Sequence, residues 1–233
     1  MASHRIFPHG EFQELAPGVW RVRGGLPFPF TRNMIVVRLP GGLLLHSVVA
    51  LDEAGMTTLE SLGRPTWSIV PSAAHRMDAP FYQARYPDLK TLTVAAVRTA
   101  VETTVKVDAT VEETLPALGI KLHAVPATRA IEYVYELAMP GGGRMLMAND
   151  VLGNINAAAP GFLGDTLFSQ IWVPSGAPNI GRLYRWLQAK DLGAIRRFLA
   201  GLADVPDLRL VTVSHGDPIT SDPAAKLRAL APA

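Results

Sequence analysis

No cysteine occurs in the 233-residue sequence, which excludes disulfide bonds and thiolate metal sites. Any metal would therefore have to be bound by histidine and carboxylate side chains. No run of about 18 apolar residues occurs either, so no membrane-spanning helix is expected. Residues 1–12 lack the apolar core of a secretory signal, and on that basis we expect a cytoplasmic protein.

Charge of one sign is not in excess, because 22 Lys and Arg residues oppose 20 Asp and Glu residues. The basic residues are scattered, so no nucleic-acid-binding surface is expected. With 48% hydrophobic and 18% charged residues, the composition is typical of a globular chain. The length predicts a single domain over residues 1–233, with residues 1–13 as an N-terminal tail.

Most of the first third of the sequence is typical of β structure. Pro40-Gly41-Gly42 predicts a tight turn between two aliphatic strands at residues 34–39 and 43–47. Both strands show little alternation of polar and apolar residues, which indicates burial on both faces. Further strands are expected at residues 19–22 and 67–70, and a helix at residues 52–62 with Asp52 as its N-cap and Gly63 as its stop.

The rest of the sequence repeats this order of a strand cluster followed by helices. Gly141-Gly142-Gly143 predicts a second hairpin. Helical or irregular segments are expected at residues 79–86 and 94–100, strands at 120–125, 131–137, 144–148 and 208–213, and helices at 180–189, 192–202 and the C-terminus.

Two strand clusters, each followed by helices, predict an α/β (α+β) fold with two mixed, mostly antiparallel sheets face to face and helices outside. This arrangement is a four-layer αββα sandwich. A doubly wound parallel sheet is the main alternative. The two glycine-rich hairpins disfavour it, because they require antiparallel neighbours.

Chemically active side chains follow three of the predicted strands. His75 and Asp78 come after the strand at residues 67–70, Asp150 follows the strand at 144–148, and His215 follows the strand at 208–213. Residues that directly follow a buried strand lie at a sheet edge, where pockets form. The sequence therefore predicts that these side chains meet in one cavity.

In this order and spacing, these residues resemble the metallo-β-lactamase superfamily over residues 14–220. Residues 32–47 resemble its opening hairpin. More narrowly, that hairpin, the Pro-x-x-x-His pattern of residues 71–75 and the Tyr86-Pro87-Asp88 sequence resemble an uncharacterised branch without an assigned substrate. The resemblance implies the four-layer sandwich and a metal-dependent hydrolase activity.

The metal-binding signature of the superfamily is only partly present. The resemblance implies a His-x-His-x-Asp-His motif after the fourth strand, and here His75 and Asp78 are available from it. Ala73 and Met77 stand at two other ligand positions and cannot bind a metal. The first motif is therefore incomplete.

Of the three later motif positions, one lacks its residue and two match. A further histidine is implied in a Pro-Gly-His-Thr-like turn, where this sequence has Ala127 or Thr128. The bridging aspartate matches Asp150, and the last histidine matches His215 in the most specific local match, His-Gly-Asp-Pro. The implied metal ligands are His75, Asp78, Asp150 and His215, and the implied catalytic residues are Asp150 and His215.

Three protein ligands and one open position for water make a catalytic metal site. Two histidines and one carboxylate suit one divalent ion of zinc, ferrous iron or manganese, whereas a second ion lacks ligands. A pocket without metal is the alternative. His75 would then be a helix cap or a buried histidine, and Asp150 a turn or N-cap residue.

Further polar residues are candidates for substrate binding. We assign this role to Arg76, Thr128 and His46, with a structural position inside its strand as the alternative for His46. Arg32 and Arg129 are candidates to bind an anionic substrate, with exposure to solvent as the alternative. Glu132 is a candidate to replace the missing histidine ligand. The apolar loop at residues 157–163 is expected to cover the pocket with Phe162 near Asp150, or to form a dimer contact.

Two classes of function follow. The first is a metal-dependent hydrolase of a small ester, lactone or phosphoester. The second is a metal-free descendant that acts as a binding or regulatory module. A di-iron oxidoreductase is disfavoured because the second metal lacks ligands. The expected partner is a small-molecule substrate rather than nucleic acid or a membrane, and the oligomeric state stays open.

Overall fold

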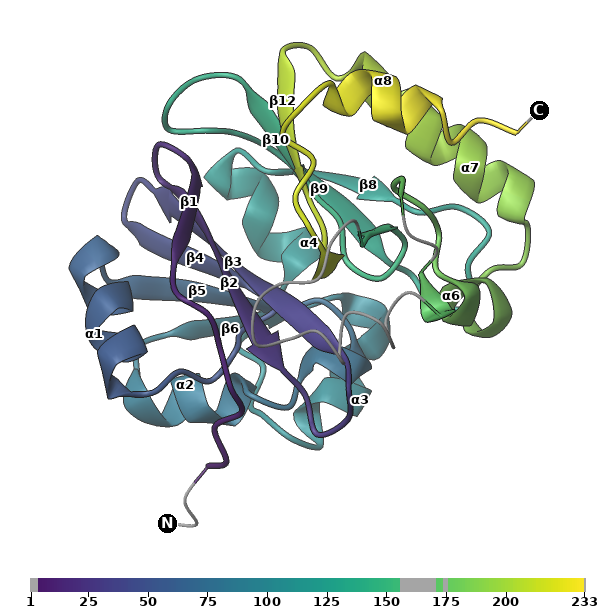
Figure 1. Ribbon diagram of the computed structural model, residues 1–233. Coiled ribbons are helices and arrows are strands. Elements are labelled where there is room, and N and C mark those ends of the chain that lie inside the picture. Colours follow the sequence, from purple (N-terminus) through teal and green to yellow (C-terminus); the bar gives the residue numbers. More distant parts are fainter. Residues whose placement is uncertain (1–3, 156–170, 174–175, 233) are drawn as a thin grey trace.

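Helices enclose two facing β-sheets in the computed structural model, which describes residues 4–155, 171–173 and 176–232 (Figure 1). Among these residues, buried apolar side chains form one cluster between the first sheet and its helices and another between the two sheets. A further cluster lies between the second sheet and the C-terminal helices. The layers are therefore helix, sheet, sheet and helix, and the predicted αββα sandwich is confirmed.

The first sheet has its strands in the order β1-β2-β3-β4-β5-β6-β7. Neighbours from β1 to β4 are antiparallel, and neighbours from β4 to β7 are parallel. The strands are β1 Gln13–Ala16, β2 Val19–Gly25, β3 Thr31–Leu39, β4 Gly42–His46, β5 Pro65–Val70, β6 Lys90–Thr93 and β7 Ala109–Thr110.

The second sheet has the order β12-β10-β9-β8, and a separate short pair joins β11 to β13. The hairpin predicted at residues 141–143 joins the antiparallel strands β9 and β10, whereas β10 and β12 are parallel. The strands are β8 Lys121–Ala124, β9 Tyr133–Ala138, β10 Arg144–Met147, β11 Gly153–Asn154, β12 Leu208–Thr212 and β13 His215–Gly216.

The helices form the two outer layers. In Figure 1, α1 and α2 lie beside the first sheet, and α7 and α8 lie on the far side of the second. Asp52 caps α1 as predicted, because its side chain accepts a hydrogen bond from Gly55 N. The helices are α1 Glu53–Leu62, α2 Ala79–Arg85, α3 Arg98–Glu102, α4 Val111–Thr114, α6 Arg182–Leu187, α7 Leu192–Gly201 and α8 Pro223–Arg228.

The packing of β3 explains why its residues do not alternate between apolar and polar. Met34 and Val36 pack in the cluster under the first layer of helices, whereas Ile35 and Val37 pack between the sheets. Both faces of the strand are therefore buried, as the continuous aliphatic run predicts.

The N-terminal segment differs from the predicted tail. Gly10 N donates to Arg23 O and Gly25 N donates to Pro8 O, each at 2.8 Å, so residues 8–10 run along β2. His4 Nε2 lies 2.9 Å from a carboxylate oxygen of Asp78. These long-range bonds hold a segment whose own sequence has no strong strand pattern.

Within the described part of the chain, no helix combines the length and the apolar character needed to cross a membrane.

Leu44 tests the packing between the sheets, where it is fully buried. We predict that Leu44→Ala lowers the free energy of unfolding by about 2–5 kcal/mol, because it leaves a cavity in a close-packed layer. Ile131→Ala is the control, since this side chain is 47% exposed, and we expect a change below about 0.5 kcal/mol. Urea denaturation measures both, and equal effects would contradict the assigned core.

Candidate metal centre

Three segments bring His75, Asp150 and His215 together at one edge of the sandwich. One ligand atom from each lies within 4.8 Å of the other two. Asp150 Oδ1 is 3.1 Å from His75 Nε2 and 3.2 Å from His215 Nε2. The carboxylate therefore lies between two imidazole nitrogens, and the predicted convergence of the three side chains is present.

Strand direction produces this convergence. Because β10 and β12 are parallel neighbours, the residues that follow them, Asp150 and His215, leave the sheet at the same edge. His75 ends the short 3₁₀ turn Ala73–His75, which follows β5 of the other sheet. The site thus contains side chains from both sheets.

Hydrogen bonds on the far side of each imidazole set its orientation. His215 Nδ1 lies 2.7 Å from the carbonyl oxygen of Thr31, and a carbonyl only accepts, so Nδ1 is the donor. His75 Nδ1 lies 2.7 Å from Ser47 Oγ. Both Nε2 atoms are left facing Asp150, which is the arrangement that metal-binding histidines use.

The segment around His215 is fixed by β3 and by its own glycine. Asn33 Nδ2 donates to the carbonyl oxygens of Val213 and Gly216, at 2.8 and 2.7 Å. Gly216 has a φ of 97°, and a Cβ there would lie 2.2 Å from the carbonyl oxygen of Asn154. A side chain at position 216 would therefore separate β13 from β11 and displace His215.

Burial and charge act in opposite directions on the ionisable groups. Burial lowers the pKa of His75, although the adjacent Asp150 opposes this. Burial alone would raise the pKa of Asp150, but His75 and His215 outweigh it and hold this pKa well below its usual range. Burial and then Asp150 raise the pKa of Glu132 to about 8. These effects favour the ionised form of Asp150 and the protonated form of Glu132.

A cavity of about 380 Å³ opens over these residues. Phe30 packs against His215, with ring centroids 4.4 Å apart. The other apolar side chains of its described lining are Leu26, Pro27, Phe28, Met77, Trp172, Val173, Leu183 and Leu187, with Ala74 beside them. The candidate centre is thus the polar end of a largely apolar cavity.

Several solved metallo-β-lactamase structures are similar in fold to this chain. The FIM-1 metallo-β-lactamase from Pseudomonas aeruginosa, solved in its mono-zinc form, is 12% identical with a TM-score of 0.62, and the match covers 97% of this chain and 95% of that one. A metallo-β-lactamase from Erythrobacter litoralis is 16% identical with a TM-score of 0.60 and 94% of each chain covered. One from Hirschia baltica is 14% identical with a TM-score of 0.54, covering 96% of this chain and 98% of that one.

The chain has the metallo-β-lactamase fold. No protein-family model and no curated protein matches its sequence. The likeness extends over nearly the whole chain at low identity, so it concerns the fold and leaves the chemistry to be argued from the site.

Within this metallo-β-lactamase fold, Asp78 lies outside the three-residue group, although the sequence predicts it as a ligand. Its carboxylate forms a buried ion pair with Arg32 and also contacts His4 Nε2 and Ala50 N, each at 2.9 Å. Three donors already satisfy this carboxylate, which is the physical reason that it is not directed at the metal group.

The predicted substrate-binding residues also lie outside the described cavity lining. Arg76 donates a hydrogen bond to the carbonyl oxygen of Ala100, and Thr128 Oγ1 donates to that of Val125 at 3.3 Å. His46 is buried behind the site with its ring 5.7 Å from that of Tyr135. None of the three is among the described residues that line the cavity. The predicted pocket loop, residues 157–163 with Phe162, lies outside the described residues.

Some residues of the site were not predicted from the sequence. Ser47, Asn33 and the carbonyl group of Thr31 orient the histidines without being candidate ligands themselves. Ser47 directly follows a buried strand, so the same strand-end rule that located His75 could have found it. Phe30 has no comparable signal, because its contact with His215 depends on the folded hairpin.

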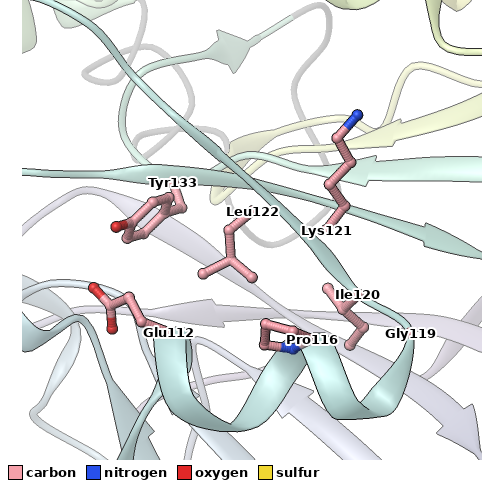
Figure 2. Close-up of a pocket in the computed structure, with 7 residues that line it drawn as sticks. All are labelled: Glu112, Pro116, Gly119, Ile120, Lys121, Leu122 and Tyr133. Carbon is pink, nitrogen blue, oxygen red and sulfur yellow. The ribbon is translucent and has the colours of Figure 1, made fainter.

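A second cavity lies against β8 and does not include His75, Asp150 or His215 among its lining residues. Figure 2 shows Glu112 and Tyr133 beside it, while Lys121 points away. Its lining residues are Glu112, Pro116, Gly119, Ile120, Lys121, Leu122 and Tyr133. Among the residues that the structure describes, this lining contains no histidine and a single carboxylate, so it offers no set of metal ligands.

His46 makes the stability depend on pH. Burial, and then the nearby His75, lower the pKa of His46 from 6.5 to about 3. Between these values the unfolded chain binds a proton that the folded protein does not. Above about pH 6.5, the contribution of His46 to the free energy of unfolding therefore does not depend on pH. Below that value, the protein becomes less stable as the pH decreases.

We predict that His46→Gln makes this decline shallower by up to about 1.4 kcal/mol per pH unit between about pH 6 and pH 4, because the variant has no imidazole to protonate at this position. Urea denaturation of both proteins with a chelator present measures the slopes. Parallel slopes would contradict the assigned effect of His46.

Proposed function

We propose that the protein is a metal-dependent hydrolase of small esters, lactones or phosphoesters, with one divalent ion held by His75, Asp150 and His215. The observation that carries this proposal is the position of Asp150 Oδ1 between two Nε2 atoms, with one ligand atom from each residue within 4.8 Å of the others. Two imidazoles and one carboxylate are a known ligand set of catalytic zinc and of ferrous iron sites.

The donor set supports one ion and not two. Both ligating nitrogens are directed by partners on their Nδ1 atoms, as a metal site requires. For a second ion, Asp78 is the nearest candidate by sequence, but its carboxylate is already engaged by Arg32, His4 and Ala50 N. The proposed site therefore holds a single ion.

A bound divalent ion would supply Lewis acidity and a water molecule of lowered pKa. The chain supplies the remaining functions. Ser47 and Thr31 hold the two imidazoles in place, and Asp150 keeps its negative charge between them. Burial and Asp150 raise the pKa of Glu132, which lowers the negative charge that it adds beside Asp150, while its Oε1 accepts a hydrogen bond from Val151 N at 2.9 Å.

The apolar wall of the cavity supports a substrate with an apolar part. Phe28, Phe30, Leu183 and Leu187 would remove water from such a substrate and hold its reactive carbonyl or phosphoryl group near the polar end. This arrangement favours small organic esters and lactones over highly charged substrates.

One observation favours a second function, a metal-free binding or regulatory module. Asp150 Oδ1 lies within 3.2 Å of Nε2 of both His75 and His215, so the three side chains contact one another directly without an ion. Side chains in contact in this way could serve as the polar end of a binding pocket. Metal analysis separates the two functions.

We predict that the purified protein binds about one equivalent of zinc, iron or manganese after supplementation, and that His215→Ala abolishes this binding because it removes one of three ligands. His123→Ala is the matched control, because His123 pairs with Glu136 in the second sheet and lies outside the group. Elemental analysis after gel filtration measures the stoichiometry. A wild-type protein without metal would overturn the hydrolase and leave the metal-free module.

Ser47 provides a finer test of the same site. We predict that Ser47→Ala keeps the stoichiometry but weakens metal binding by about 10- to 100-fold, because the His75 ring loses the partner that orients it. Competition with a chromogenic chelator measures the affinity. An unchanged affinity would show that the Ser47 contact has no part in the site.

A further inference from the structure

Arg32, the second residue of β3, is a cation in the wall of the cavity. It is 1% exposed, and it lines the cavity together with His75, Asp150 and His215. No other arginine or lysine is among the described lining residues. From the sequence alone, Arg32 is a candidate to bind an anionic substrate or to face solvent. Its burial excludes the second alternative.

The guanidinium group of Arg32 is only partly satisfied. Its Nη2 donates to Asp78, whereas Nε and Nη1 are buried and have no hydrogen-bond partner among the described residues. Buried donors of a charged group are normally paired, because an unpaired one has lost its hydration without compensation. Nε–H and Nη1–H lie on different edges of the planar group, and each of them lacks an acceptor.

Asp78 does not supply that acceptor. Its carboxylate is shared among Arg32, His4 Nε2 and Ala50 N. Only one arm of the guanidinium contacts it, whereas a two-armed pair would use two parallel N–H groups. The ion pair therefore holds Arg32 in position and leaves Nε–H and Nη1–H without an acceptor.

The cavity is the space beside Arg32 in which an acceptor could bind. Arg32 forms part of its wall, and the remaining wall is mainly apolar, with Phe28, Phe30, Leu183 and Leu187. A carboxylate is an anionic acceptor for such an unpartnered N–H group, and an apolar body would suit the other side chains.

We propose that Arg32 binds a carboxylate group of the substrate, which makes the substrate class an apolar ester or lactone that carries a separate carboxylate. This inference rests on the proposed function, because it concerns the substrate of the same site. Arg32 is then a specificity residue that holds the carboxylate while the ester group lies at His75, Asp150 and His215.

The kinetic test compares two esters of the same length. Mono-p-nitrophenyl glutarate carries a terminal carboxylate, and p-nitrophenyl valerate does not. For the metal-supplemented full chain, we expect kcat/KM to be about tenfold or more higher for the glutarate, with the difference mainly in KM, since charge-assisted hydrogen bonds are among the stronger ones.

The variant for this test is the pair Arg32→Gln with Asp78→Asn. Changing Arg32 alone would leave a buried carboxylate without its cation and could unfold the protein, whereas the double change removes both charges. We expect R32Q/D78N to lose the preference for the glutarate, so that the two esters have similar kcat/KM values in the variant. The matched control is R64Q/D88N, which removes an exposed arginine–aspartate pair and should keep the preference.

A binding measurement separates this inference from the proposed function. Calorimetric titration with 4-phenylbutyrate and with its neutral amide needs no hydrolysis. If neither ester is hydrolysed but wild-type protein binds the carboxylate more tightly than the amide and R32Q/D78N does not, the hydrolase fails and the role of Arg32 stands. If both esters are hydrolysed equally and both titrants bind equally, the role of Arg32 is overturned. A preference for the carboxylate that survives in R32Q/D78N also overturns it.

Discussion

The contact of one carboxylate with two imidazoles is the interaction on which the candidate site depends. Asp150 is held ionised by His75 and His215, against a burial effect that would otherwise favour its neutral form. The two rings are in turn oriented from behind, by Ser47 Oγ and by the carbonyl oxygen of Thr31. Both imidazoles therefore have a defined direction before any ligand arrives, and this preorganisation is what metal binding and catalysis both require.

The fold supplies this arrangement through strand direction and cross-connections between the two sheets. Parallel pairing of β10 with β12 brings two of the three segments to the same edge, and Asn33 of β3 ties the segment around His215 to the first sheet. The Arg32–Asp78 ion pair lies beside them and is contacted by His4 from the N-terminal segment. Changes in the first strands or in the N-terminal segment can therefore alter the site, although they are distant from it in the sequence.

The sequence predicts those parts of the structure that have local causes. Two glycine-rich turns and several buried aliphatic runs were enough for the αββα layers, and the strand-end rule located the three residues that converge. Strands β6 and β7 were missed because they are short and gain their hydrogen bonds from neighbours distant in the sequence. Ser47 was missed because the sequence predicts a strand at residues 43–47 that includes it, whereas β4 ends at His46. The contacts of Arg76 and Asp78 depend on side-chain directions beyond a strand end, which alternation does not fix.

The most direct test of the central claim is an X-ray structure of crystals grown with manganese or zinc, with anomalous differences measured at the absorption edge of the metal. The account predicts one strong peak about 2.0–2.2 Å from His75 Nε2, His215 Nε2 and a carboxylate oxygen of Asp150. A peak held by other residues would contradict it, as would two peaks in the cavity or none there at full metal supplementation.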